Sequence, residues 1–268
     1  MTDLLHYHFM QNAYAAGTLV ALLAGAAGYF VVLRGQSFVA HMLSQVGFPG
    51  AAAGVLLNVS PVIGLLVFCG AGAAAIGALG RNVDAGRRAE SAAVGSLLAL
   101  ALGLGLLFVR LHGGSAQSVY AFLFGTILGI TDTDVALTLV ITIAGLAVLA
   151  VMARPLVFAS VDPDVAEARG VPVRALSLAF LLVLALSVAV TVQVVGTLLI
   201  FALLVAPPAA ALQLAAKPAL AFALSVALAV AVTWIGLALA YYTDFPVGFF
   251  VTTLGFGAYV VARGAKAL

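Results

Sequence analysis

Charged residues are scarce in this chain: Asp, Glu, Lys and Arg make up 7% of its 268 residues, whereas hydrophobic residues make up 65%. A soluble domain carries roughly 25% charged residues. This chain therefore lacks the polar surface that a soluble fold requires, and its composition indicates an integral membrane protein. The formal net charge of +2 is too small to indicate a nucleic-acid partner.

Three further features restrict the classes of function that the chain can have. The single cysteine, Cys69, lies inside an apolar run and gives no indication of disulfides. No glycine-rich loop ends in Gly-Lys-Ser or Gly-Lys-Thr, so any ATP chemistry must belong to another subunit, and we expect a non-catalytic membrane subunit. None of the nine acidic residues falls in the middle of an expected span, which argues against a secondary carrier that moves protons or sodium on buried carboxylates.

Long apolar runs predict an all-α membrane protein with about nine membrane-spanning helices in one polytopic domain, residues 1–268. A helix needs about 20 apolar residues to cross the hydrocarbon core of a bilayer. A shorter apolar piece, 118–130, is expected to be re-entrant or to lie at the membrane interface. The expected spans are 13–33, 38–59, 62–80, 92–111, 135–153, 175–193, 196–214, 219–241 and 245–262.

Basic residues predict the orientation. With nine spans and the N-terminus outside, every Lys and Arg except Arg110 falls in an inner loop, which is a nearly complete positive-inside bias. If 118–130 also crossed the membrane, the arginines would be divided between the two sides. We therefore expect the N-terminus outside and the C-terminus in the cytoplasm.

The loop "RPLVFASVDPDVAEARGVPVRAL" carries the start and stop signals of a short cytoplasmic helix, about 162–170, between spans five and six. Such a helix is either an ordinary interfacial helix or a docking element for a soluble partner. The signals are Asp162 as N-cap, Pro163 at the first helical position, Asp164 and Glu167 in the first turns, Arg169 near the end, Gly170 as left-handed cap and Pro172 as terminator.

Two polar residues inside the second span, His41 and Gln45, are spaced four apart, so their side chains share one helix face. Polar and ionisable groups inside a span are costly and indicate function by default. The structural alternative is a hydrogen bond that holds helices together. Pro49 and Gly50 follow and are expected to break the helix.

Other polar or helix-breaking positions carry weaker signals. Asn58, Gln193 and Thr197 are possible lining residues of a pathway. Pro207 and Pro208 are expected to interrupt span seven, either as part of a transport site or as a packing kink.

Several segments resemble the bacterial ABC permeases for zinc, manganese and iron ions, from about Gly17 to the C-terminus. These are "GYFVVLRGQSFVAHMLSQVGFPGAAAG", "FLFGTILGITDTDV", "SVDPDVAEARGVPVRAL", "VVGTLLIFALLVAPPAAALQLA" and "TDFPVGFFVTTLGFGAYVVAR". The resemblance implies a bacterial plasma-membrane protein that works as a homodimer with two cytoplasmic ATPase subunits and an extracytoplasmic metal-binding protein. It also implies that 162–170 is the coupling helix, that ATP binds to the partner subunit, and that the transported ion is the only metal involved.

The family usually has Asp and His where this chain has His41 and Gln45, aligned on Pro49-Gly50. The spacing is kept, but a neutral His/Gln pair holds a divalent ion less tightly than an Asp/His pair. Imidazole suits zinc, whereas carboxylate suits manganese, so the change favours zinc over manganese or iron. Two alternatives are a secondary ion-coupled carrier and an ABC permease for an iron chelate, whose members typically have more spans.

Overall fold

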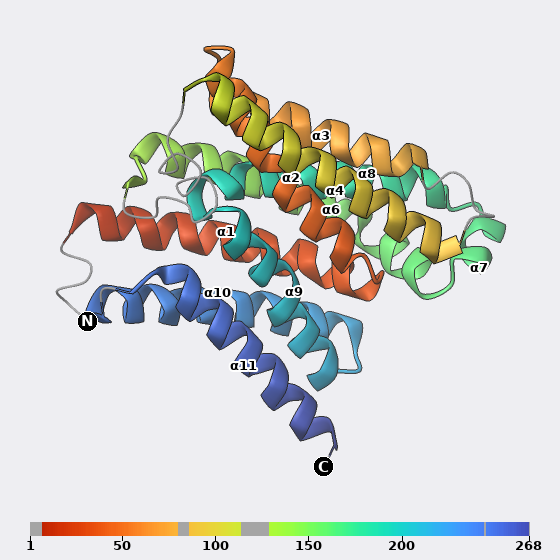
Figure 1. Cartoon of the computed structure of the whole chain (residues 1–268). Coiled ribbons are helices and arrows are strands. Elements are labelled where there is room, and N and C mark those ends of the chain that lie inside the picture. The colour runs from red at the N-terminus through yellow and green to blue at the C-terminus, as the bar shows by residue number, and fades with distance from the viewer. Residues whose placement is uncertain (1–6, 80–85, 114–128, 244, 268) are drawn as a thin grey trace.

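The computed structural model describes residues 7–79, 86–113, 129–243 and 245–267, and the secondary structure in these ranges is helical (Figure 1). Each expected span coincides with one long helix. The long helices are α1 (His8–Leu33), α2 (Ser37–Leu56), α3 (Pro61–Leu79), α4 (Gly86–Leu111), α6 (Asp132–Val161), α8 (Val173–Val195), α9 (Thr197–Leu214), α10 (Pro218–Thr243) and α11 (Val247–Ala267), and a short helix, α7 (Pro163–Ala168), lies between α6 and α8.

Length and apolarity confirm an all-α membrane protein. Seven of the described helices are long and apolar enough to cross a bilayer, and in α8 and α9 the apolar stretches among the described side chains are Val173–Ala189 and Leu199–Leu214. The number of nine complete spans stays a prediction for that reason.

The helices α1 and α2 carry much of the core, together with buried side chains of α8 and α9 such as Leu184 and Leu204. The most apolar stretches of α1 and α2 are 72% and 78% buried, far more than those of the outer helices. In Figure 1, α2, α3, α4 and α8 lie on one side of α1 and α10 and α11 on the other, while α9 crosses α1 from the first side to the second. A close approach brings α2 against α3: a Cβ atom on Gly50 would lie 2.6 Å from the Gly64 carbonyl oxygen, so only glycine fits there.

Side-chain contacts at one end of the bundle show how the helices run. The Asn12 Nδ2 of α1 donates to Asp132 Oδ1 at 2.8 Å and to the Ile130 carbonyl at 3.1 Å, so α1 and α6 begin side by side. His8 Nε2 lies 3.6 Å from the same Asp132 oxygen. A capping box between Thr131 and Asp134 fixes the start of α6.

The helix α4 ends at this same end. Phe38 and Phe48 of α2 contact Gly95 and Gly105 of α4 in the same order, so α4 runs parallel to α2 and antiparallel to α1. The nine-span topology predicts that α6 runs parallel to α1, and the contacts between the starts of these two helices agree with that direction. The expected re-entrant segment falls mainly on residues 114–128, which lie outside the described residues.

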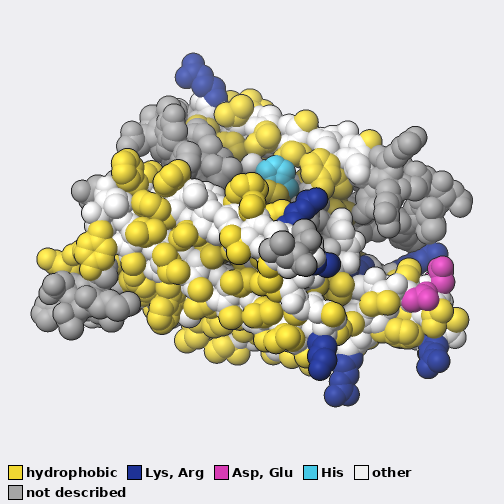
Figure 2. All heavy atoms as spheres, turned by 90° about the horizontal axis from the view of Figure 1, so that it is seen from below, with side chains coloured by type: hydrophobic (Ala, Val, Ile, Leu, Met, Phe, Trp, Pro, Cys, Tyr) yellow, Lys and Arg dark blue, Asp and Glu magenta, His cyan; other side chains and the backbone are white. Residues whose placement is uncertain are grey.

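The space-filling view in Figure 2 shows a face that is mostly hydrophobic. Lys and Arg side chains lie mainly in its right-hand half, the half that holds α7 in Figure 1. This distribution suits a membrane protein whose basic end faces the cytoplasm, as the loop charges predict.

Candidate functional site

His41 and Gln45 lie one turn apart on α2, inside the helix bundle. Both residues are only partly exposed, and His41 Nδ1 and Gln45 Oε1 are buried without a hydrogen-bond partner. The structure thus gives no support to the alternative that a His–Gln hydrogen bond holds the helices together: in the described part of the chain, neither side chain makes a hydrogen bond. The imidazole instead packs on Phe201 of α9, with the ring centroids 4.6 Å apart at an interplanar angle of 62°.

A third unpartnered polar atom belongs to the same region. Thr197 begins α9, its side chain is fully buried, and its Oγ1 has no hydrogen-bond partner. Thr197 precedes Phe201 by one turn, just as Gln45 follows His41 by one turn. Because α2 and α9 run in opposite directions, this spacing puts Thr197 at the level of Gln45. We call His41, Gln45 and Thr197 the polar cluster.

Buried polar atoms without partners are uncommon because each costs roughly 1–3 kcal/mol of desolvation. Three such atoms on two neighbouring helices need an explanation that packing does not supply. A polar ligand or water passing between α2 and α9 would satisfy all three, so the polar cluster is the candidate site.

The turn between α8 and α9 positions Thr197. It consists of Gly196, which is buried and has φ +84°, a conformation that favours glycine. Val192, one turn earlier, packs on Gly47 in the middle of α2: a Cβ atom on Gly47 would lie 3.4 Å from Val192 Cγ1. The turn is therefore inside the bundle. Irregular backbone at such depth occurs where protein buries it or where it lines a cavity, as in transport proteins.

The prolines do not end their helices. The helix α2 continues through Pro49 and Gly50, and α9 continues through Pro207 and Pro208. Pro49 lacks an N–H group, however, and so cannot donate to the carbonyl of Gln45, four residues earlier. That backbone oxygen is a further acceptor next to the polar cluster, and the proline spacing is the sequence signal that could have revealed it.

Two weaker candidates do not join the cluster. Asn58 lies beyond the end of α2, exposed, with φ +55°, roughly 20 Å along the helix direction from Gln45. Its backbone N–H donates to the Val55 carbonyl, so it ends the helix and turns the chain. The side chain of Gln193 lies outside the described residues, and its lining role stays a prediction.

No strong resident metal site is present in the part of the chain that the structure describes: no group of three or more His, Cys, Asp or Glu side chains could hold a metal ion there. In the polar cluster, His41 supplies the one imidazole, and the other donors are an amide and a hydroxyl. All three groups can be neutral, so the cluster can contact a cation without trapping it.

The short helix α7 has the predicted caps. Asp162 accepts a hydrogen bond from the Val165 N–H at 3.0 Å, and Pro163 occupies the first turn. Gly170 has φ +82° and donates to the Glu167 carbonyl at 2.9 Å. Residues 162–165 and 167–170 are exposed, while Ala166 is buried beneath them. The helix is therefore held in place and presents Asp164, Glu167 and Arg169 outward.

Comparison with known proteins shows to which family the chain belongs. The family model described as the ABC 3 transport family matches residues 6–265. The chain belongs to the ABC 3 transport family. This membership confirms the predicted resemblance to the permeases of metal-type ABC importers, which are integral membrane subunits.

Individual proteins that are similar to this ABC 3 family chain include transport permeases and a solved structure. The manganese transport system membrane protein MntC of Halalkalibacterium halodurans is 32% identical, over 78% of this chain and 70% of the relative. The manganese import system permease protein ScaB of Streptococcus parasanguinis is 30% identical, over 90% of this chain and 85% of the relative. The solved structure of PsaBC from Streptococcus pneumoniae in complex with Fab has a TM-score of 0.87 at 28% identity, covering 97% of this chain and 93% of that one.

Proposed function

We propose that this chain forms the pathway by which a divalent transition-metal ion crosses the bacterial plasma membrane, with the polar cluster as a weak contact point on the way. The observation that carries the proposal is the presence of three buried, unpartnered polar atoms, His41 Nδ1, Gln45 Oε1 and Thr197 Oγ1, on facing helices of the bundle. A passing ion would satisfy these atoms transiently.

A weak site suits passage. Conduction requires that an ion bind well enough to enter and weakly enough to leave. The cluster holds no carboxylate, and His41 rests against the apolar ring of Phe201, so a bound ion meets neutral donors only. ATP hydrolysis by a partner would then supply the direction of transport, because the chain itself lacks a phosphate-binding loop.

Zinc is the ion that the donor set favours. The His41 imidazole suits zinc, and the cluster lacks the carboxylate that manganese prefers, although its carbonyl and hydroxyl oxygens can bind either ion. Manganese is the second candidate, since the relatives MntC and ScaB are named for manganese.

Uptake into proteoliposomes distinguishes the two ions. The permease would be reconstituted with its ATPase and its binding protein and supplied with radioactive zinc or radioactive manganese. We expect ATP-dependent zinc uptake at least several times faster than manganese uptake at equal free concentration. In the His41→Asp variant, which restores a carboxylate at this position, we expect the ratio to shift toward manganese. A wild-type preference for manganese would refute the zinc assignment.

The remaining parts of the assembly follow from the family. We propose a homodimer of this chain, two cytoplasmic ATPase subunits that dock on α7, and an extracytoplasmic metal-binding protein at the opposite end, where α1 and α6 begin. The exposed, doubly capped geometry of α7 supports the docking role, because a simple connection between α6 and α8 does not need a separate rigid helix. The N-terminus is then outside and the C-terminus cytoplasmic.

A further inference from the structure

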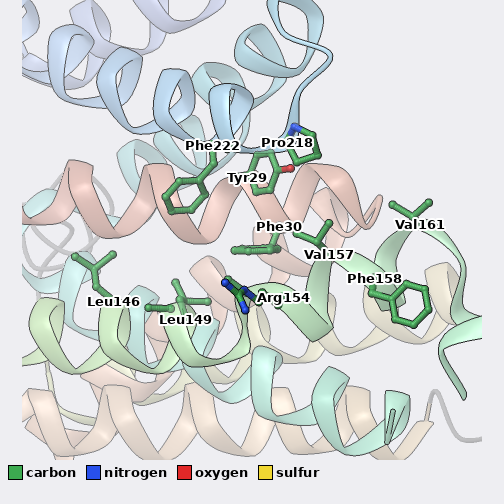
Figure 3. A pocket seen from close by; sticks show the side chains of 13 residues that line it. Tyr29, Phe30, Leu146, Leu149, Arg154, Val157, Phe158, Val161, Pro218 and Phe222 are labelled. Carbon is green, nitrogen blue, oxygen red and sulfur yellow. The ribbon is translucent and has the colours of Figure 1, made fainter. Parts of the chain in front are cut away.

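A groove of about 810 Å³ lies between α1, α6 and the start of α10, on a different set of helices from the polar cluster. Its volume is within the range of small-ligand pockets, about 300–1,000 Å³. The lining is aliphatic and aromatic except for one charged side chain. In Figure 3 the Arg154 side chain lies among Phe30, Leu149 and Val157, with Phe222 of α10 across the groove.

Arg154 has no counter-ion in the protein as far as the structure describes it. The residue is exposed, and among the described residues no carboxylate lies within 4.0 Å of its guanidinium. An arginine on an apolar wall is costly unless its charge reaches water, a headgroup or an anion. The Arg154 guanidinium is therefore the point in the groove where an anionic ligand would bind.

The depth of Arg154 indicates where that partner lies in the membrane. Arg154 follows Asp132 by 22 residues, roughly 33 Å along α6, whereas the hydrocarbon core is about 30 Å thick. The guanidinium therefore lies near the headgroups at the α7 end, and the apolar part of the groove, with Leu146 and Leu149, extends toward the middle of the membrane. Lys217, exposed and directly before Pro218 of the lining, adds positive charge at this end.

The groove opens toward lipid. Apolar residues at the groove on α6 and α10 are strongly exposed: Val161 of the lining by 74%, and Val151 and Leu220 next to lining residues by 82% and 51%. In a membrane protein, acyl chains of the bilayer can cover such a surface, so a ligand that enters the groove from this side comes from the bilayer.

We infer that this groove binds an anionic phospholipid of the leaflet at the α7 end, with the phosphate on Arg154 and one acyl chain along Phe30, Leu149 and Phe222. A guanidinium presents paired donors that match two phosphate oxygens. Basic pockets between helices on the cytoplasmic side recognise anionic headgroups in this way. This inference does not depend on which ion the protein carries.

Native mass spectrometry of the full-length permease in mild detergent tests the inference. Phosphatidylglycerol and phosphatidylcholine with identical chains would be titrated separately. We expect the wild type to bind phosphatidylglycerol more tightly, and Arg154→Gln to lose about fivefold of that affinity while leaving phosphatidylcholine binding unchanged. Arg174→Gln, an exposed arginine outside the groove, should change neither affinity.

A second variant tests the acyl-chain part of the inference. Ala150 lines the groove and is exposed, so Ala150→Trp fills the groove without disturbing the core. We expect it to weaken both lipids, with an unchanged elution volume in size exclusion. The inference is overturned if Arg154→Gln keeps the full preference for phosphatidylglycerol, if Ala150→Trp binds both lipids as the wild type does, or if either variant changes the oligomeric state instead of lipid binding.

Discussion

Replacing His41 by alanine is expected to reduce ATP-dependent zinc uptake by at least tenfold in proteoliposomes that contain the permease, its ATPase and its binding protein. The variant removes the one imidazole of the polar cluster and leaves an amide and a hydroxyl, which bind zinc poorly. A tenfold loss corresponds to about 1.4 kcal/mol, a modest demand for the loss of a nitrogen ligand.

The control separates transport from folding. Ser96→Ala removes an exposed hydroxyl of α4 that donates only to the Ala92 carbonyl of its own helix, and the variant should transport zinc as the wild type does. Co-purification with the ATPase should be the same for both variants. If His41→Ala transports zinc at the wild-type rate, His41 is a structural histidine that packs on Phe201, and the pathway lies elsewhere.

Replacing Gly170 by valine is expected to uncouple ATP hydrolysis from transport. Gly170 has φ +82°, and a β-branched residue held in that conformation costs of order 1–3 kcal/mol, so the end of α7 must rearrange. If α7 has the proposed coupling role, a displaced α7 would not transmit movement of the ATPase to α6 and α8. We expect ATP hydrolysis to continue while zinc uptake falls at least tenfold. Glu167→Ala should have the same kind of effect, because it changes the exposed surface of α7.

A matched control for Gly170→Val exists at the other end of the bundle. Gly113 has φ +74° and is exposed after α4, so Gly113→Val introduces a similar backbone strain. It should leave the ratio of transported zinc to hydrolysed ATP unchanged. Unchanged zinc uptake in both Gly170→Val and Glu167→Ala would contradict the coupling role of α7.

Local signals made much of this fold predictable. The length of an apolar run fixes where a membrane helix lies, and each expected span therefore coincides with a long helix. The caps of α7 were predictable because Asp162, Pro163 and Gly170 act through neighbouring backbone groups.

Features that depend on packing between distant segments were not predictable. The burial of Gly196 within the bundle follows from the packing of Val192 on Gly47. Thr197 lies at the level of Gln45 because α2 and α9 are antiparallel. No pattern in the sequence indicates that Phe201 is the neighbour of His41. Asn58 has a polar side chain, as a lining residue would, yet its left-handed backbone conformation shows that it turns the chain.

The central claim is that the transported ion contacts the polar cluster, and protection of a thiol at that position tests it most directly. His41→Cys would be made in a Cys69→Ala background, since Cys69 is the one native cysteine. The assembled transporter would be treated with a small charged methanethiosulfonate reagent during ATP turnover, with and without zinc. Asn58→Cys in the same background is the control outside the cluster.

We predict that zinc slows modification of the His41→Cys variant at least severalfold and leaves the Asn58→Cys variant unaffected. Equal modification of the His41→Cys variant with and without zinc would show that the ion does not pass the polar cluster, and would contradict the proposed pathway.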